Sequence, residues 1–539
     1  MKSPRALLAF LLLLATLLAG VAYHGIFGLT LLGWDAYPMI ASAKVSNVAD
    51  FVGIFTEELM DGRYPDGHFY RPITNLTLAF DHMLWGLAPN GYHASDVLIL
   101  IANAVLLGLI GRKLYTRQIT QGVGVGGEVG GRIAAIVALV IFVLHPIQLE
   151  LLPVTPRRAD ALCLTFTLLA ICITRHRATP ARQVLVGLFA FAAAGSKETG
   201  AIVAPLLTAW LVLQRSQDQP AAWRCVAVSA TPAWIGVAVF VLLRSSVLGG
   251  LGGHEESSLS GLAGSFGLIE PYVIRVFYPQ PFAGIDQAAR IAVLGVAASV
   301  VISAALLAWR HDAARKPSTQ QAVSSGRHTS AKQATQPLAG DAGYVPVRTD
   351  GSSSMHSFAW LACWTLLLLA ISSLSGRVHD WYAMMFAAPA ALCIGGATEL
   401  AVIAFRRGDK WLAPSAALAP AAAALSLLLN SPLNPISTLG RDERWPLAST
   451  LTESFLSRAT ERIDEHPDGG DLLLNRWVPV LAPPEGARGI RSAAVLAPYS
   501  VDAFLELTRP ERVIEVVAGT AQLPTPLNGA THLRLTTAP

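Results

Sequence analysis

Carboxylates and cations gather in the segment that follows the first apolar stretch of the chain. Asp35 stands at the end of that stretch, where a carboxylate could take a proton from an attacking hydroxyl group. Arg71 closes the same segment, and its guanidinium could hold a phosphate oxygen. Charged groups beside a bilayer are costly to desolvate and are usually kept for function. The alternative for Asp35 is a solvated aspartate at the membrane interface.

Further ionisable residues stand in two turns between later apolar stretches. These residues are His145, Arg157, Arg158, Asp160, Lys197 and Glu198. The cations among them suit a phosphate or pyrophosphate. A cation at a helix end also often extends to the lipid headgroups, so each one alone has a second interpretation.

Two acidic residues of the first loop are predicted to share a helix face. Residues 52–60 have the pattern of a short helix, which would place Glu57 and Asp61 one turn apart. The solvated face of a surface helix has the same pattern. We expect no soluble cofactor and assign no metal ligands, and whether a divalent metal is needed stays open. The first loop could supply carboxylates to a divalent cation, but nothing in their spacing requires one.

Composition sets the broad class. A chain of 539 residues with 53% hydrophobic and 14% charged residues is too apolar for a soluble protein. The apolar residues come in blocks of about 20, which is the length that crosses a bilayer. A net charge of +4 without a basic, aromatic stripe excludes a nucleic-acid partner. The five cysteines have unrelated spacings and imply neither disulfides nor a metal site.

The sequence predicts an all-α polytopic membrane protein with about 11 transmembrane helices. The expected spans are residues 6–27, 94–111, 133–151, 159–174, 183–196, 200–213, 225–243, 291–309, 357–375, 382–404 and 412–430. Lys2 and Arg5 place the N-terminus in the cytoplasm, and the basic residues gather in alternate loops. The C-terminus is then extracytoplasmic. A cleaved signal peptide is the alternative for the first span.

Two domains are expected, a membrane domain over residues 1–430 and a small extracytoplasmic α/β domain over 431–539. The membrane domain contains the acidic first outer loop, 28–93, in which 74–87 is amphipathic and expected to lie on the membrane surface. It also contains a polar cytoplasmic linker, 311–356, expected to be disordered. In the C-terminal domain we expect a helix over 451–463 and strands over 492–497 and 512–517.

An ordered set of motifs covers roughly residues 30–205. The motifs are Trp34-Asp35, Tyr70-Arg71-Pro72-Ile73-Thr74, Gly91-Tyr92-His93, His145-Pro146-Ile147, Arg158-Ala159-Asp160-Ala161-Leu162 and Lys197-Glu198-Thr199-Gly200. Together they resemble the GT-C type membrane glycosyltransferases. The resemblance is greatest to the protein O-mannosyltransferase branch that carries TPR repeats, and to its bacterial relatives.

The resemblance implies an inverting enzyme that transfers a sugar, as a hexosyltransferase, from a polyprenyl-phosphate donor to a protein or glycan outside the cytoplasm. Asp35 would then be the catalytic base. The candidates for binding the donor phosphate are Arg71, Arg157, Arg158 and Lys197. The candidates for binding the acceptor or supporting these groups are Glu57, Asp61, His93, His145, Asp160 and Glu198. The implied location is a bacterial inner membrane.

Three departures from the family pattern limit what carries over. Asp35-Ala36 stands where the family often has two acidic residues, and Gln148 stands where a second histidine is expected. The TPR repeats are absent. The sugar and the acceptor therefore stay undetermined. Two alternatives remain open, a transporter or lipid flippase and a non-catalytic membrane scaffold with this fold.

Overall fold

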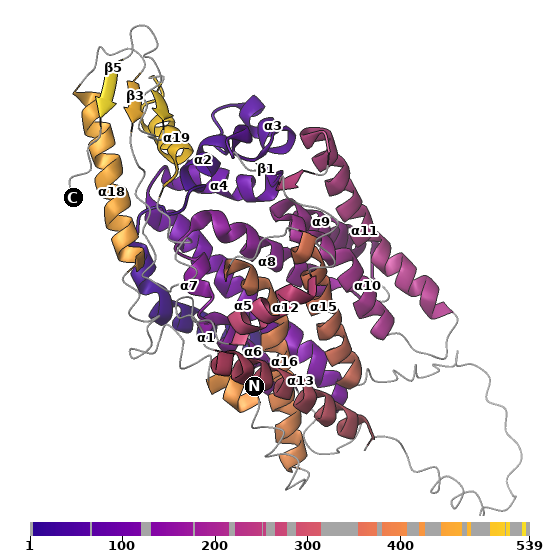
Figure 1. Cartoon of the computed structure of the whole chain (residues 1–539). Coiled ribbons are helices and arrows are strands. Elements are labelled where there is room, and N and C mark those ends of the chain that lie inside the picture. Colours follow the sequence, from indigo (N-terminus) through magenta and orange to yellow (C-terminus); the bar gives the residue numbers. More distant parts are fainter. Residues whose placement is uncertain are drawn as a thin grey trace, which may run out of the picture.

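The protein is described by a computed structural model that is mostly helical (Figure 1). The residues that the structure describes are 4–64, 67–119, 131–175, 178–214, 221–250, 252–254, 265–277, 287–313, 354–374, 380–406, 420–425, 444–465, 472–475, 496–511, 514–517 and 531–534. Most of the expected linker and most of the span 412–430 lie outside them, as does most of the strand expected over 492–497.

The helices of the bundle are α1 (Pro4–Tyr23), α5 (Pro89–Ile119), α6 (Arg132–Leu144), α7 (Gln148–Leu151), α8 (Arg158–Ile173), α9 (Pro180–Ser196), α10 (Val203–Leu213), α11 (Ala221–Leu248), α12 (Ser265–Phe277), α13 (Gln287–Ala313), α15 (Ser354–Leu374) and α16 (Ala383–Arg406). Short 3₁₀ helices are η1 (His24–Gly28), η2 (Leu59–Gly62), η3 (Thr155–Arg157), η4 (Glu198–Ile202) and η6 (Asp380–Tyr382).

Within the described residues, six helical segments are long and apolar enough to cross a bilayer, as expected of a multi-pass membrane protein. These segments are Arg5–Gly28, Pro89–Tyr115, Trp223–Leu248, Ile291–Trp309, Met355–Ser373 and Ala383–Arg406. Arg132–Leu144 and Glu198–Leu213 are shorter apolar helices. The expected span 133–151 is not one helix, because α6 ends at Leu144 and the chain turns at His145. The total of 11 spans stays a prediction.

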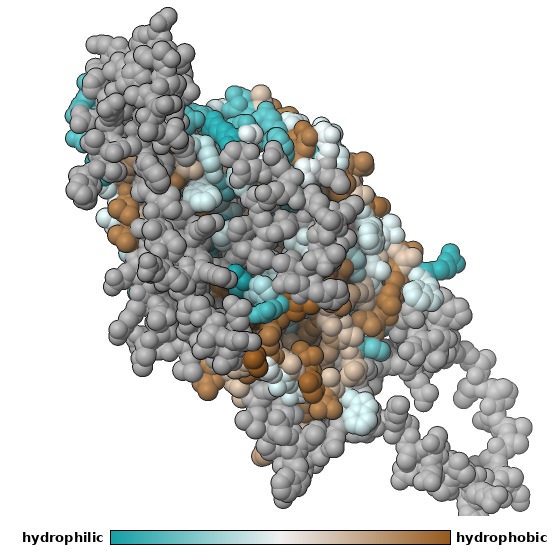
Figure 2. Space-filling model, in the orientation of Figure 1, coloured by the Kyte–Doolittle hydropathy of each residue, from teal (hydrophilic) through white to brown (hydrophobic). Residues whose placement is uncertain are grey.

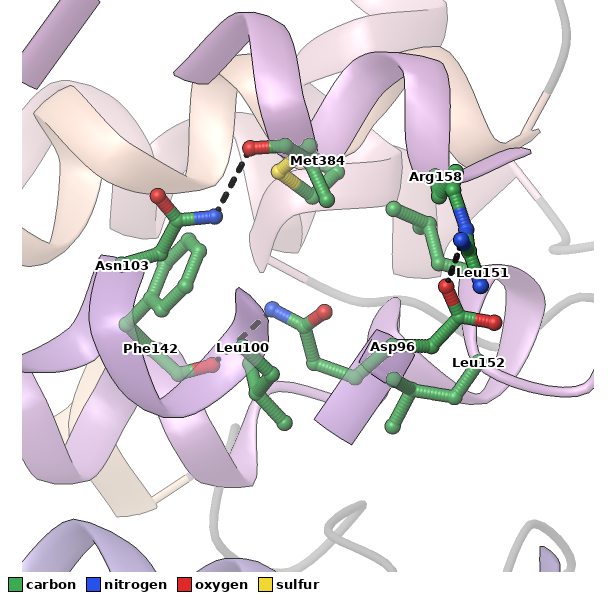
Figure 3. Close-up of a pocket in the computed structure, with 10 residues that line it drawn as sticks. Asp96, Leu100, Asn103, Phe142, Leu151, Leu152, Arg158 and Met384 are labelled. Carbon is green, nitrogen blue, oxygen red and sulfur yellow. Dashed lines mark hydrogen bonds and ion pairs between the residues drawn. The ribbon is translucent and has the colours of Figure 1, made fainter. Parts of the chain in front are cut away.

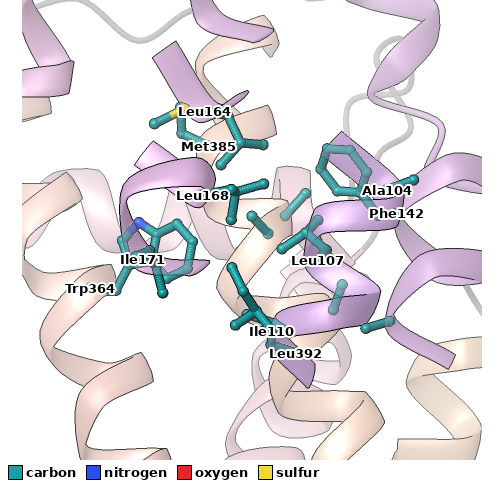
Figure 4. Packing of buried hydrophobic residues seen from close by; sticks show 14 of the residues in the cluster. Ala104, Leu107, Ile110, Phe142, Leu164, Leu168, Ile171, Trp364, Met385 and Leu392 are labelled. Carbon is teal, nitrogen blue, oxygen red and sulfur yellow. The ribbon is translucent and has the colours of Figure 1, made fainter. Parts of the chain in front are cut away.

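Small residues allow the central helices to pack closely. A Cβ atom at Gly395 of α16 would lie 2.7 Å from the carbonyl oxygen of Ala134 in α6, so only glycine fits this crossing. Such close approach is a main source of helix association in membranes. Around it, α5, α6, α8, α15 and α16 bury one continuous apolar cluster (Figure 4). Outward-facing leucines such as Leu17 and Leu242 are exposed, as lipid-facing residues are. Figure 2 shows hydrophobic residues on the surface of the bundle.

One end of the bundle, here called the polar end, carries the first loop. The loop folds into α2 (Ala36–Ser42), α3 (Val48–Thr56), β1 (Gly67–His68) and α4 (Pro72–Trp85), which Figure 1 shows gathered with α19 (Pro498–Thr508). β1 pairs with β2 (Gly253–His254), which follows α11. The outward face of α4 is apolar, with Met83 70% and Leu84 64% exposed. Its expected place on the membrane surface stays a prediction.

The helix expected over residues 52–60 is wrong in its C-terminal half. α3 ends at Thr56, and Met60 and Asp61 have φ angles of 58° and 54°, in the left-handed region. Glu57 and Asp61 therefore do not share a helix face. The turn is stabilised from outside the segment, because the Leu59 amide donates to the carbonyl of Phe69.

The described C-terminal elements are α18 (Arg444–Asp464), α19 and three short parallel strands, β3 (Leu472–Asn475), β4 (Ile514–Val517) and β5 (Thr531–Arg534). β3 lies in the middle of the sheet, with Leu472 opposite Ile514 and Thr531. The helix expected over 451–463 lies within α18, and β4 lies within the strand expected over 512–517. Whether this region is a separate domain stays a prediction.

A buried arginine joins three helices at the polar end. Arg158, at the start of α8, lies 2.5 Å from Asp81 of α4 and 2.8 Å from Asp96 of α5, and its side chain is 1% exposed. It also donates to the carbonyl of Tyr92. Ser95 and Thr155 donate to the two carboxylates. All three side chains are buried, with at most 7% exposed, so each charge depends on its partners.

Replacing Arg158 with Met is expected to lower the free energy of unfolding by roughly 3–5 kcal/mol, because two buried carboxylates lose their counter-ion. Thermal unfolding of the purified protein in detergent measures the change. The control Arg224→Met removes an exposed cation of α11 and is expected to have little effect. Adding Asp81→Asn and Asp96→Asn to Arg158→Met should restore part of the stability. Equal stability of Arg158→Met and the control would contradict the structural role of this network.

Candidate functional site

A pocket of about 260 Å³ opens at the polar end of the bundle. Its polar wall comes from the residues before α4, from the start of α8, from the turn between α9 and α10 and from the end of α11. Its apolar wall comes from α15 and α16. The lining residues are Phe69, Arg71, Asp160, Lys197, Glu198, Thr199, Arg244, Gly252, Gly253, Leu368, Ile371, Ser372, Tyr382, Met385 and Phe386.

A tight turn brings Lys197 and Glu198 to the pocket. Lys197 follows α9 and has an extended backbone conformation, and η4 begins at the next residue. The chain folds back closely, because a Cβ atom at Gly200 would lie 2.2 Å from the backbone of Ala193. Thr74 of α4 donates to the carbonyl of Ser196 and connects this turn to the first loop.

Glu198 is bound by two arginines from distant parts of the chain. Its carboxylate accepts from Nε and Nη2 of Arg71, at 3.3 and 3.1 Å, and from Nη1 of Arg244, at 2.9 Å. The Arg71 guanidinium also lies over the ring of Phe69. Although burial opposes ionisation, the two arginines lower the pKa of Glu198 to about 2. The three side chains therefore stay charged at neutral pH.

Lys197 and Asp160 form the second ion pair of the pocket. The Lys197 Nζ atom lies 2.7 Å from both carboxylate oxygens of Asp160, in the first turn of α8. It also lies 4.0 Å from the centre of the Tyr382 ring. Burial lowers the pKa of Lys197, and Asp160 opposes that effect.

The charges that line the pocket do not cancel. Three cations, Arg71, Lys197 and Arg244, face two carboxylates, Asp160 and Glu198, which leaves one positive charge in excess. The apolar wall of α15 and α16 lies on the other side. A site of this composition suits an anionic headgroup with an apolar chain, because phosphate prefers cations and the chain prefers hydrocarbon.

Asp35 lies just ahead of α2, at the N-cap position, and is half-buried. The hydroxyl of Tyr499 donates to its Oδ1 atom at 3.1 Å. Burial raises the pKa of Asp35, while Tyr499, Arg71 and Arg157 act to lower it. The net direction is upward, which makes this carboxylate a stronger base than an exposed aspartate.

Arg157 connects the region of Asp35 to the pocket. It contacts the Glu150 carboxylate at 3.4 Å and lies 3.8 Å above the ring of Trp381. Trp381 packs edge-on against Tyr382, which lines the pocket. Arg157 is not among the lining residues of the pocket, and its contact with the donor phosphate stays a prediction.

Arg158 and His145 lie outside the pocket. The Arg158 network borders a separate cavity of about 20 Å³, room for about one water molecule, with Asp96 and Asn103 in its wall (Figure 3). The His145 Nδ1 atom accepts from the amide of Ile147, so Nε2 carries the proton and donates to the carbonyl of Val276. His145 therefore connects the α6–α7 turn to α12 as a neutral ring.

His93, Glu57 and Asp61 are also placed away from the pocket. The buried His93 contacts the carbonyl of Leu29 through Nε2. Glu57 is the residue that follows α3, and Asp61 lies in η2, close to Arg63. The structure thus brings together Arg71, Asp160, Lys197 and Glu198 from the residues that the sequence singled out, with Asp35 and Arg157 nearby.

Arg244 and Tyr499 are not among the residues that the sequence singled out. The sequence could have indicated Arg244, because an arginine inside an apolar stretch long enough to span a membrane is typical of a functional site. It could not have indicated Tyr499, since its contact with Asp35 joins residues 464 positions apart. Among the described residues, no group of three or more His, Cys, Asp or Glu side chains is placed to hold a metal ion.

No family model and no curated protein matches the chain. It is similar to the solved structure of ArnT from Cupriavidus metallidurans bound to undecaprenyl phosphate, with 11% identity, a TM-score of 0.42 and coverage of 95% of this chain and 90% of that one. It is also similar to the Archaeoglobus fulgidus oligosaccharyltransferase in complex with Zn and sulfate, with 11% identity, a TM-score of 0.45 and coverage of 94% of this chain and 62% of that one.

A third similar structure is the archaeal oligosaccharyltransferase AglB from Archaeoglobus fulgidus in complex with an inhibitory peptide and a dolichol-phosphate. Its identity is 13% and its TM-score 0.41, with 94% of this chain and 64% of that chain covered. This chain spans less than two thirds of the archaeal enzymes. ArnT and AglB are GT-C glycosyltransferases, the class that the motifs resemble, while the O-mannosyltransferase branch stays a prediction.

Replacing Glu198 with Gln is expected to lower the free energy of unfolding by about 2–3 kcal/mol at neutral pH. The pKa of Glu198 is depressed in the folded protein, so its stabilisation is complete above its ordinary pKa of 4.5 and is lost as the pH falls toward about 2. The difference in thermal stability from the unchanged protein should therefore narrow between pH 4.5 and 2. The exposed Glu461→Gln serves as the control, and a difference that does not change with pH would contradict the assignment.

Proposed function

We propose that this protein is an inverting glycosyltransferase that uses a polyprenyl-phosphate sugar as its donor. The observation that supports it most is the pocket with one excess positive charge beside an apolar wall, near a carboxylate whose pKa is raised. The donor's phosphate would lie against Arg71, Lys197 and Arg244. The first isoprene units would lie against α15 and α16.

The proposed reaction is a single displacement at the anomeric carbon. The acceptor hydroxyl attacks the face opposite the phosphate, and its proton passes to Asp35 as the new carbon–oxygen bond forms. The bond from the anomeric carbon to the phosphate oxygen breaks, and its electron pair leaves with the phosphate. One displacement inverts the configuration of the sugar carbon.

The charges of the pocket match the charge that develops in this reaction. A phosphodiester donor carries one negative charge, and the released lipid phosphate carries more. Cations that are already held in place by Asp160 and Glu198 stabilise the leaving group without being reordered. The raised pKa of Asp35 suits a group that must accept a proton at the moment of attack.

We further propose that the sugar is a hexose, that the acceptor is a protein or glycan, and that transfer occurs on the extracytoplasmic face of a bacterial inner membrane. These proposals rest on the sequence motifs and on the distribution of basic residues in the loops. A transporter or flippase is less well supported, since its polar residues would be expected near the middle of the bilayer. Here the ion pairs gather at the polar end.

Replacing Asp35 with Asn is expected to reduce sugar transfer about 100-fold or more, because the amide cannot take the acceptor's proton. The measurement is transfer of labelled sugar from a panel of polyprenyl-phosphate donors in membranes that contain the acceptor. Asp50→Asn is the matched control, since Asp50 is a partly exposed carboxylate of the same loop and belongs to the capping box of α3. Full activity of Asp35→Asn would remove Asp35 as the base. Activity in neither protein, with donor and acceptor both shown to be present, would favour the scaffold.

Replacing Arg244 with Met is expected to raise the KM for the donor about tenfold with a smaller change in kcat, because one phosphate-binding cation is lost. Steady-state kinetics with a water-soluble short-chain donor give both constants. The exposed Arg224→Met on the same helix is the control. An unchanged KM would place the donor phosphate elsewhere.

A further inference from the structure

The C-terminal helix α19 packs directly on the segment that contains Asp35. The ring of Phe504 packs edge-on against Tyr37 of α2, with 5.1 Å between the ring centres. Two residues further along α19, Glu506 pairs with Arg63 of the first loop at 2.6 Å. α18 adds a contact of its own, because the Ser449 hydroxyl accepts from the amide of Thr30. The C-terminal region is therefore connected to the first loop at several points.

Hydrogen bonds connect the start of α19 to the start of α2. The Ser500 hydroxyl accepts from the amide of Ala497 at 2.9 Å and donates to the carbonyl of Trp34. Ala497 precedes α19 and Trp34 precedes Asp35, so this one hydroxyl joins the two helix starts. Tyr499 lies between Ala497 and Ser500 in the chain, and its side chain is half-buried. Its hydroxyl therefore approaches Asp35 from a fixed backbone.

Three groups from three different elements act on the Asp35 carboxylate. Arg157 comes from η3, Arg71 comes from the residue before α4, and Tyr499 comes from α19. The two arginines act through their charge. Tyr499 contacts Oδ1 directly at 3.1 Å, so it also fixes the direction in which the carboxylate points. Oδ2 is the carboxylate oxygen that does not receive this hydrogen bond.

We propose that Tyr499 is a positioning residue for Asp35 and that the C-terminal region thereby forms part of the active site. The proposal rests on the proposed role of Asp35 as the base. It assigns a function to the region after residue 431 in which the sequence showed no catalytic group. Tyr499 itself transfers no proton to or from the substrate, and it acts by orienting the base.

The test compares Tyr499→Phe with the unchanged full-length protein. The hydroxyl stabilises the charged form of Asp35, so its removal should raise the pKa of that carboxyl by about one unit. The acidic limb of the pH dependence of kcat/KM for sugar transfer should then move up by the same amount. Tyr37→Phe is the matched control, because it removes a hydroxyl that bonds to Thr30 and keeps the ring that packs against Phe504 of α19.

A second measurement does not depend on activity. A water-soluble carbodiimide with an added amine labels protonated carboxyl groups, and mass spectrometry of the peptide that contains Asp35 gives the pH of half-labelling. That pH should rise in Tyr499→Phe and stay unchanged in Tyr37→Phe. If Tyr499→Phe does not fold, 3,5-difluorotyrosine at position 499 makes a stronger donor, and the pH of half-labelling should fall.

The outcomes separate this inference from the proposed function. An unchanged half-labelling pH in Tyr499→Phe or in the difluorotyrosine protein would overturn the positioning role, even if Asp35→Asn abolishes transfer. A shifted half-labelling pH together with an active Asp35→Asn would keep the contact but remove its catalytic meaning. A shift of equal size in Tyr37→Phe would show that loosening of the interface is the cause, and would also overturn the proposal.

Discussion

Ionic groups that are removed from water must be paired, and this requirement organises the polar end of the protein. Arg158 is held between Asp81 and Asp96, and Glu198 is held between Arg71 and Arg244. Each set joins helices that are far apart in the sequence. An unpaired charge in such a place would cost several kcal/mol, so the loops at this end cannot move independently of the helices below. The fold of the first loop is therefore inseparable from the packing of the bundle.

The two sets of ion pairs have opposite net charges and different surroundings. The set around Arg158 has one cation for two carboxylates and is enclosed beside a cavity of water size. The set around Glu198 has two cations for one carboxylate and faces a pocket of about 260 Å³. An enclosed network has no access for a ligand, whereas an open one with excess positive charge can bind an anion. This difference, rather than residue type, separates a structural arginine from a candidate ligand-binding arginine.

Much of the fold follows from composition, and much of the site does not. Apolar blocks predict the spanning helices because the bilayer sets their length, and motif residues such as Lys197 fall where the turns must be. The sequence could not separate Arg158 from Lys197, because their partners come from helices whose packing it does not specify. The helix predicted over residues 52–60 ends early, at Thr56, and the Leu59 amide instead donates to the carbonyl of Phe69, a residue outside the segment. The contact of Tyr499 with Asp35 could be found only in the tertiary structure.

The central claim is that a lipid-linked phosphate occupies the pocket between the cations and the α15–α16 wall. Photo-crosslinking tests it most directly, using a polyprenyl phosphate with a diazirine on its first isoprene units and the purified protein in lipid nanodiscs. Peptide mapping should place the crosslinks on Leu368, Ile371, Met385 and Phe386. Excess unlabelled polyprenyl phosphate should remove them, and free polyprenol should not. Crosslinks spread over lipid-facing residues such as Leu17 and Leu242, without competition by the phosphate, would contradict the account.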